Sequence, residues 1–92
     1  GNAPLPEGCV ALESPVAGSV WQVRVGLGER VAAGQTVMVL ESMKMEIDLV
    51  AEVEGIVERI AGEAGQPVRA GQTLMIIRHT PADEPATEVI QA

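Results

Sequence analysis

The stretch ESMKME, residues 41–46, joins two halves of the chain that are near copies of each other. Residues 14–40 align with residues 51–77 at a constant offset of 37 without a gap, and 10 of the 27 aligned pairs are identical. Because a self-match indicates the architecture before any local propensity does, we expect the halves to pack as a pseudo-symmetric pair. The identical pairs are Val16/Val53, Gly18/Gly55, Val20/Val57, Gly28/Gly65, Val31/Val68, Ala33/Ala70, Gly34/Gly71, Gln35/Gln72, Thr36/Thr73 and Met38/Met75.

The composition favours β-structure. Apolar residues make up 47% of the chain but Trp21 is its single aromatic residue, so the core must consist of Val, Ile, Leu, Met and Ala. The β-branched residues favour strands, and 10 glycines and 6 prolines in 92 residues imply many turns. Trp21 aligns with Glu58 of the second half, so we expect it to be partly buried at a sheet edge rather than to contact a partner.

Short β-type runs separated by turn residues follow one another from Val10 onward. No stretch has a sustained i, i+3, i+4 apolar pattern, so we expect no helix and an all-β fold. We expect a flexible segment at 1–8, one folded domain at 9–79 and a flexible acidic tail at 80–92. The expected strands are 10–13, 19–25, 29–31, 36–41, 45–51, 55–60, 67–69 and 73–78.

Charge and composition argue against several classes of protein. The net charge of −7 disfavours nucleic-acid binding; it serves solubility or, alternatively, steers basic partner surfaces. Apolar runs are too short for a membrane span, and no signal-peptide pattern occurs. Cys9 has no second cysteine to pair with, which fits a reducing, cytoplasmic environment, and with only His79 beside it no metal-ligand set exists.

The connector between the halves allows its strand pairing to be derived. If Met43 and Lys44 are the two central residues of a tight hairpin, the apolar pairs fall on one face, as a core-facing pleat requires. Glu41 and Glu46 then fall on the other face, in solvent. A shift of the turn by one residue breaks this separation, so we expect Lys44 at the tip. The pairs running outward are Ser42/Met45, Glu41/Glu46, Leu40/Ile47, Val39/Asp48 and Met38/Leu49.

Two local rules are broken at this tip. Two-residue hairpins prefer Asn or Gly because both central residues take a positive φ, which Met43 and Lys44 adopt poorly. Glu41 and Glu46, directly opposite each other, repel. Places where local sequence logic fails are candidate functional sites. The alternative is a merely solvated lysine, but Lys44 lies in the one stretch that has no counterpart in the duplication, which favours function.

Residues 41–47, ESMKMEI, resemble the attachment motif of biotinyl domains, the biotin carboxyl carrier modules of biotin-dependent carboxylases. The resemblance covers about residues 10–78 and includes SPVAGSV at 14–20, GERV at 28–31 and GQT at 34–36. It implies a flattened β-barrel or sandwich of two four-stranded antiparallel sheets with pseudo-twofold symmetry, the lysine being exposed on a hairpin. The chain departs from the family at Ser42, where Ala is usual, and at Glu52, where Pro is common.

The same resemblance implies that biotin is attached covalently to Lys44. A biotin protein ligase would present an activated biotinyl group, and the Lys44 amine would attack its carbonyl to form an amide. The cofactor would then shuttle a carboxyl group between biotin carboxylase and carboxyltransferase partners, while the chain itself has no catalytic residue and binds no metal. The motif residues implicated in these encounters are Lys44 and its neighbours Glu41, Ser42, Met43, Met45 and Glu46.

Two other functions are compatible with such a fold. A lipoyl domain also carries its cofactor on the hairpin lysine, although Met rarely precedes the lysine there. A lipoyl-like barrel of a membrane efflux adaptor is structural, but long helical hairpins separate its halves.

Met43 and Met45 could alternatively fill gaps in the core instead of contacting partners. We expect a cytoplasmic domain, monomeric when isolated, that binds neither nucleic acid nor membranes.

Overall fold

The computed structural model describes residues 5–81, and this part of the chain forms eight β-strands and no helix. The all-β prediction is therefore confirmed, and strand ends lie within one or two residues of those expected. The strands are β1 Cys9–Glu13, β2 Gly18–Val23, β3 Arg30–Val31, β4 Thr36–Ser42, β5 Met45–Val50, β6 Gly55–Ile60, β7 Pro67–Val68 and β8 Thr73–His79.

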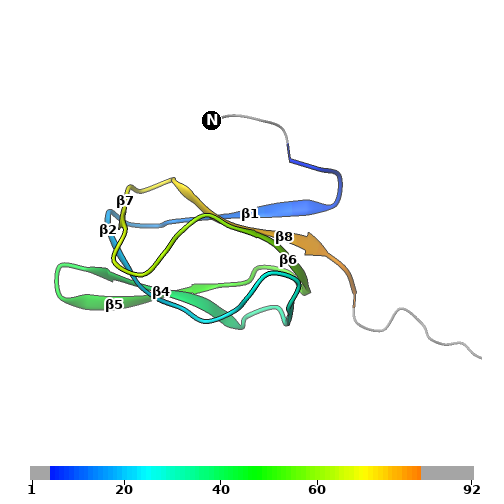
Figure 1. Cartoon of the computed structure of the whole chain (residues 1–92), viewed down its shortest axis with the longest axis horizontal. Coiled ribbons are helices and arrows are strands. Elements are labelled where there is room, and N and C mark those ends of the chain that lie inside the picture. The colour runs from blue at the N-terminus through cyan, green and yellow to red at the C-terminus, as the bar shows by residue number, and fades with distance from the viewer. Residues whose placement is uncertain (1–4, 82–92) are drawn as a thin grey trace, which may run out of the picture.

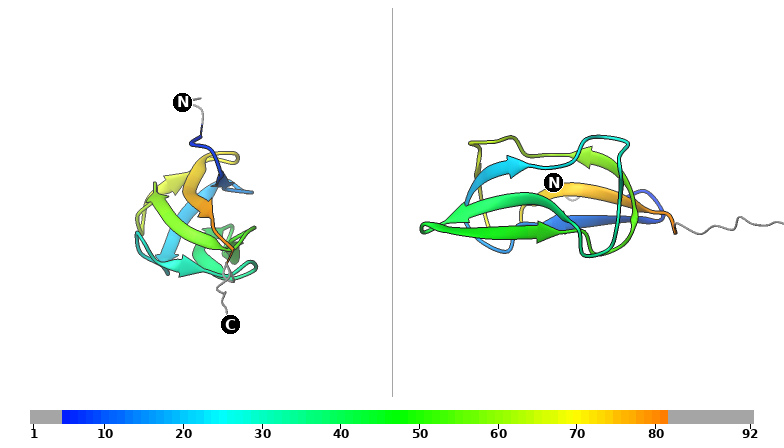
Figure 2. Two further views of the ribbon diagram at one scale, coloured as in Figure 1. Left: turned by 90° about the vertical axis from the view of Figure 1, so that its right-hand side faces the viewer. Right: turned by 90° about the horizontal axis from the view of Figure 1, so that it is seen from below.

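The strands form two four-stranded sheets that face each other and enclose the core (Figures 1 and 2). One sheet has the order β1-β8-β6-β3 and the other β5-β4-β2-β7, and every pairing is antiparallel. The predicted pair of four-stranded antiparallel sheets is confirmed. Lys44 lies in the turn that joins β4 to β5, so the candidate lysine belongs to the second of these sheets.

The offset of 37 residues that aligns the two halves of the sequence also relates the strands of the two halves. It maps β2 onto β6, β3 onto β7 and β4 onto β8, from first residue to last. A β-bulge between Val20 and Gln22 recurs between Val57 and Arg59. The remaining strands, β5 and β1, occupy equivalent outer positions beside β4 and β8. The two sheets are thus related by the predicted pseudo-twofold symmetry.

Each sheet takes its last strand from the other half of the chain. The short β7 pairs with β2, and the equivalent β3 pairs with β6. Equivalent backbone bonds flank the exchange: the Val20 N–H donates to the Gln66 carbonyl and the Val57 N–H to the Glu29 carbonyl, both at 2.9 Å. Because this exchange completes both sheets, neither half can form its sheet alone.

The identical residues of the duplication have visible structural roles at the turns. Gly34 has a φ of 87°, which favours glycine, and its N–H donates to the carbonyl of Ala51 at 2.8 Å. The side-chain oxygen of Gln35 accepts a bond from the N–H of Ala32 at 2.9 Å. Equivalent contacts recur around Gly71 in the second half. The AGQT repeat is thus a turn that satisfies its own backbone groups.

The core between the sheets is aliphatic, as the composition requires. Equivalent positions of the two halves fill it in pairs, so Met38 and Met75 are both 0% exposed, as are Leu40 and Ile77. The buried cluster comprises Leu12, Val20, Val25, Val31, Val37, Met38, Leu40, Leu49, Ala51, Val57, Val68, Leu74, Met75 and Ile77.

Trp21 departs from one expectation. Its side chain is 45% exposed, which confirms partial burial. However, β2 is an inner strand between β4 and β7, so the predicted position at a sheet edge is wrong. Trp21 lies at the bulge of β2, and β7 pairs only with Gly18 and Ser19. A residue of an inner strand can remain exposed because the outer face of a sheet that packs on the core with its other face is in solvent.

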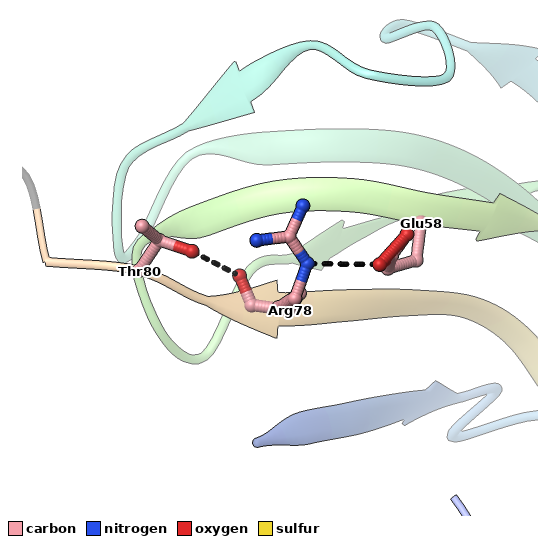
Figure 3. A network of polar contacts seen from close by, with 3 residues as sticks. All are labelled: Glu58, Arg78 and Thr80. Carbon is pink, nitrogen blue, oxygen red and sulfur yellow. Dashed lines mark hydrogen bonds and ion pairs between the residues drawn. The ribbon is translucent and has the colours of Figure 1, made fainter. Parts of the chain in front are cut away.

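The β4–β5 hairpin projects from one end of the barrel, whereas the chain enters β1 and leaves β8 at the opposite end (Figures 1 and 2). At that opposite end, Arg78 of β8 forms an ion pair with Glu58 of β6 at 2.8 Å, and the Thr80 hydroxyl donates to the Arg78 carbonyl at 3.2 Å (Figure 3). The flexible segments predicted at 1–8 and 80–92 fall largely outside the described residues and stay predictions.

Candidate functional site

The hairpin pairs in the predicted register. Ser42 is opposite Met45, Glu41 is opposite Glu46, and the inner pairs continue as Leu40/Ile47, Val39/Asp48 and Met38/Leu49. The side chains of Leu40 and Leu49 point into the core and are 0% and 7% exposed. Glu41 and Glu46 are exposed, as the alternation of the strands requires. The core-facing pairs therefore hold the turn at Met43 and Lys44.

The two turn residues adopt an unfavourable backbone conformation. Met43 has a φ of 52° and Lys44 a φ of 68°, and between residues 5 and 81 no other residue except glycine has a positive φ. This left-handed conformation costs an L-residue on the order of 1–2 kcal/mol. Every other positive-φ position described is a glycine. A strained Met-Lys pair at this one turn indicates that the side chains are needed there.

The side chains at the tip are open to solvent. Met43 is 92% and Met45 65% exposed, which excludes the alternative that they fill gaps in the core. Lys44 is exposed as well. Within residues 5–81, no hydrogen bond or ion pair engages its amine. The amine is therefore free to react with an external group.

Next to its turn, the hairpin is held to the body of the barrel by contacts that the sequence pattern did not reveal. The Ser42 hydroxyl donates to the backbone carbonyl of Ala17 at 2.8 Å. Beside it, β2 approaches β4 so closely that a Cβ on Gly18 would collide with the Glu41 carbonyl. The identity of Gly18 with Gly55 was the available signal for this close approach. No such signal indicated the hydrogen bond of the Ser42 hydroxyl, because the Ala17 carbonyl that accepts it is remote in sequence.

The far end of the hairpin is also pinned. The Thr36 hydroxyl at the start of β4 donates to the Asp48 carboxylate of β5 at 3.1 Å. Together with the contact of Ser42, this bond limits sliding of the two strands past each other. The site is therefore an exposed amine on a rigid support, with no cavity needed to define it.

The chemistry available to this site is nucleophilic. No cluster of three or more His, Cys, Asp or Glu side chains suited to a metal ion occurs among residues 5–81. Over the same residues, no helix has the length and apolar character that a membrane span requires. A primary amine without a neighbouring base can be acylated by another protein that removes its proton. The arrangement suits a residue that is modified.

A two-sheet barrel that presents a single lysine on a strained, exposed hairpin defines a small domain for attachment of a prosthetic group. The family described as "Biotin-requiring enzyme" matches residues 10–77, and the chain belongs to this biotin/lipoyl attachment family. Its fold and sequence relatives place it among the biotinyl-type domains of that family.

Two named relatives are similar in sequence. The "Biotin/lipoyl attachment protein" of Bacillus subtilis (strain 168) is 49% identical over 45 residues, which cover 49% of this chain and 62% of that protein. The "Biotin carboxyl carrier protein" of Streptococcus mutans is 39% identical over 49 residues, or 53% of this chain and 38% of that protein. The matched part is thus less than two thirds of either relative.

A solved structure agrees with the fold. A "single-chain, multi-domain long-chain acyl-CoA carboxylase" superposes with a TM-score of 0.80 and 33% sequence identity. The similarity covers 92% of this chain and 9% of the carboxylase chain. The present chain therefore corresponds to one small part of that enzyme.

Proposed function

We propose that this chain is a biotin carboxyl carrier domain, in which biotin is joined by an amide bond to Nζ of Lys44. The main support is the position of the only lysine of the chain at the exposed, strained tip of a hairpin in a biotin-family barrel. The neighbouring methionines favour biotin over lipoate, because lipoyl sites rarely have Met before the lysine. A carrier role follows from the site, which offers an attachment point and no catalytic group of its own.

The residues at the tip fit attachment of biotin. The Lys44 amine is exposed and makes no internal interaction within the described residues, so acylation costs the fold nothing. A lysine amine gives up a proton when it forms an amide with an acyl carbon. Because no base among residues 5–81 makes a hydrogen bond or ion pair with Lys44, we propose that a biotin protein ligase removes that proton and supplies the activated carboxyl group of biotin.

The barrel has the properties that a carrier needs after attachment. When bound, biotin supplies a ureido nitrogen that accepts and releases a carboxyl group. The chain contributes position: core-facing Leu40 and Ile47 and the Ser42 bond to Ala17 fix the point from which the arm extends. Tethering the group in this way raises its effective concentration at each partner, typically to the millimolar range for a short linker.

The partners proposed are the biotin protein ligase and the biotin carboxylase and carboxyltransferase components of a biotin-dependent carboxylase. The long-chain acyl-CoA carboxylase contains a domain of this fold within a single multi-domain chain. The acidic net charge of −7 and the exposed Glu41 and Glu46 would favour basic surfaces around the partner sites. The choice of carboxyl acceptor is assigned to the carboxyltransferase, since the carrier only presents the carboxylated group to it.

A paired ligase assay tests the proposal. The purified chain is incubated with ATP and either biotin plus a biotin protein ligase or lipoate plus a lipoyl ligase, and its intact mass is measured. We expect one biotinyl group per chain and no lipoyl group, with neither added to Lys44→Arg. Lipoylation without biotinylation would identify a lipoyl carrier, and modification of the Lys44→Arg chain would show that Lys44 is not the site.

A further inference from the structure

The four methionines of the chain fall into two sharply different environments. Met38 and Met75 occupy equivalent positions of the two halves and are both 0% exposed. Met43 and Met45 flank Lys44 and are 92% and 65% exposed. The exposed pair belongs to the one hairpin that has no counterpart in the duplication. An oxidant in solution can therefore reach the sulfur atoms beside the lysine without reaching those of the core.

The folded state gains little from methionine at either exposed position. Met43 has a positive φ, which glycine or asparagine adopts more easily, and its side chain remains in solvent. Met45 is exposed on β5, opposite Ser42. Their flexible, polarisable side chains suit adaptable apolar contacts with other proteins. Oxidation would change that contact surface while the strand register, which depends on buried pairs, stays the same.

We propose that Met43 and Met45 are a peroxide-sensitive pair whose oxidation to sulfoxides blocks modification of Lys44. In the reaction, the thioether sulfur attacks one oxygen of a hydroperoxide, the O–O bond breaks and an S–O bond forms. The sulfur is oxidised by two electrons, and hydrogen peroxide is reduced to water. A thiol-dependent sulfoxide reductase reverses the step, releasing the oxygen as water while two thiols form a disulfide.

The block follows from the position of the two sulfur atoms. Each sulfoxide places a polar, hydrated group next to the amine that the ligase must enclose and desolvate. Both residues are adjacent to Lys44 in sequence and exposed at the same hairpin tip, so a ligase that encloses the amine meets their side chains. The proposed block of modification rests on the proposed attachment of biotin to Lys44. The selectivity of oxidation rests on exposure alone and is independent of that proposal.

Peptide mapping after limited peroxide treatment tests the selectivity. The folded chain is treated with hydrogen peroxide, quenched with catalase, digested and analysed by mass spectrometry. We expect sulfoxide at Met43 and Met45 while Met38 and Met75 remain unoxidised, and equal oxidation of all four in chain unfolded by denaturant. Oxidation of the core pair as fast as the tip pair in the folded chain would overturn the proposal.

Biotinylation rates measured before and after oxidation test the block. We expect oxidation to slow ligase modification of Lys44 by about tenfold or more, as loss of a contact anchor does at protein interfaces. Treatment with methionine sulfoxide reductases should restore the rate. Circular dichroism should show an unchanged fold. An unaltered rate in a chain oxidised at both positions would overturn the block, as would a lost rate that reduction of the sulfoxides does not restore.

The double variant Met43→Leu with Met45→Leu supplies the matched control. Leucine is apolar and similar in volume but cannot form a sulfoxide. Each chain is compared with its own untreated sample, so the basal rate of the variant does not enter the result. We expect the ratio of treated to untreated rates to stay near one in the variant. A wild-type chain that is not biotinylated before treatment would instead refute the attachment itself, while the peptide map would still decide the selectivity.

Discussion

At the scale of single residues, the tip of the hairpin carries conformational strain that the rest of the fold avoids. All other positive-φ positions between residues 5 and 81 are glycine, whereas Met43 and Lys44 adopt this conformation with full side chains. Both side chains are exposed, so packing does not offset the strain. Strain retained without a packing benefit is characteristic of a functional site.

Substitution of the turn residue Met43→Asn should stabilise the domain. Asparagine tolerates the left-handed conformation, so we expect the free energy of unfolding to rise by about 0.5–1 kcal/mol. Urea denaturation measures the change. The matched control is Met45→Asn on strand β5, where no positive φ is relieved and asparagine is a poor strand former. A gain of equal size in the control would show that relief of turn strain is not the cause.

The substitution Lys44→Arg should abolish attachment and leave the fold intact. The guanidinium keeps the positive charge but does not form the amide, so biotin incorporation should be lost. Because the side chain is exposed, we expect the free energy of unfolding to change by no more than about 0.5 kcal/mol. Thermal unfolding followed by circular dichroism measures it. A collapse of the melting temperature would mean that Lys44 has a structural role.

At the scale of elements, strand pairing and two side-chain hydrogen bonds hold the β4–β5 hairpin that carries Lys44. Core-facing pairs such as Leu40/Ile47 fix its register, and the Ser42 hydroxyl beside the turn donates to the Ala17 carbonyl. If the ligase recognises this geometry, then the position of the lysine within the turn matters as well as its exposure.

Exchange of the two turn residues, Met43→Lys with Lys44→Met, tests this geometry. The composition and the core-facing pairs stay the same, so the fold should survive. The amine leaves the turn from its first central position, in a different direction. Since misplacement by about 1 Å can cost roughly a hundredfold in rate, we expect biotinylation to be abolished or sharply slowed. Ligase modification at the wild-type rate would show that exposure of a lysine is sufficient.

The elements also show which features a sequence can reveal. The register of the β4–β5 hairpin could be predicted because Leu40/Ile47 and Glu41/Glu46 separate onto opposite faces at only one alignment. The exchange of β3 and β7 between sheets could not, because strands of two residues have no periodicity to read. The position of Trp21 was wrong because exposure was taken to indicate a sheet edge, whereas an inner strand also exposes side chains on the outer face of its sheet.

At the site, the exposure of Lys44 and the conformation of its turn could be predicted from the sequence. The hydrogen bond that holds the hairpin to the barrel could not. The positive φ of Met43 and Lys44 is a consequence of a two-residue turn, which the register required. The bond from Ser42 to Ala17 joins residues 25 apart through one side-chain oxygen. No periodic pattern specifies such a contact, so only the structure reveals it.

At the scale of the whole molecule, the duplication produced equivalent sheets with different tasks. The end of β4 continues into the lysine hairpin, while the equivalent end of β8 leads to the end of the described chain. In both sheets a glycine permits close approach of neighbouring strands: a Cβ on Gly18 would collide with the Glu41 carbonyl, and one on Gly55 with the Arg78 carbonyl. Substitutions at these two equivalent glycines therefore allow a loss of stability to be distinguished from a change in the hairpin that carries Lys44.

The matched variants Gly18→Ala and Gly55→Ala should therefore destabilise the domain to a similar extent. Overpacking of this kind costs roughly 1–3 kcal/mol, and both sites require a backbone shift. The control is Gly26→Ala, where a Cβ meets nothing within 4 Å, so we expect a change within about 0.5 kcal/mol. Urea denaturation of the three variants measures these differences, and a large difference between the first two would contradict the pseudo-symmetry argument.

The same pair should differ in its effect on attachment. Gly18→Ala displaces β4 at Glu41, close to the turn that carries Lys44, whereas Gly55→Ala acts on the other sheet. We expect ligase assays under conditions where both variants are folded to show slower biotinylation for Gly18→Ala alone. Equal slowing in both would indicate that loss of stability, and not hairpin geometry, determines the rate.

Attachment of biotin to Lys44 can be detected by peptide mapping of the chain after expression in a host with an active biotin ligase. Lys44 is the only lysine, so the competing nucleophile is the amine at the chain's N-terminus. We expect the tandem mass spectrum to locate one biotinyl group on the peptide containing residues 41–46, at Lys44. A lipoyl group on Lys44, biotin on the N-terminal amine, or no modification despite active ligase would contradict attachment of biotin to Lys44.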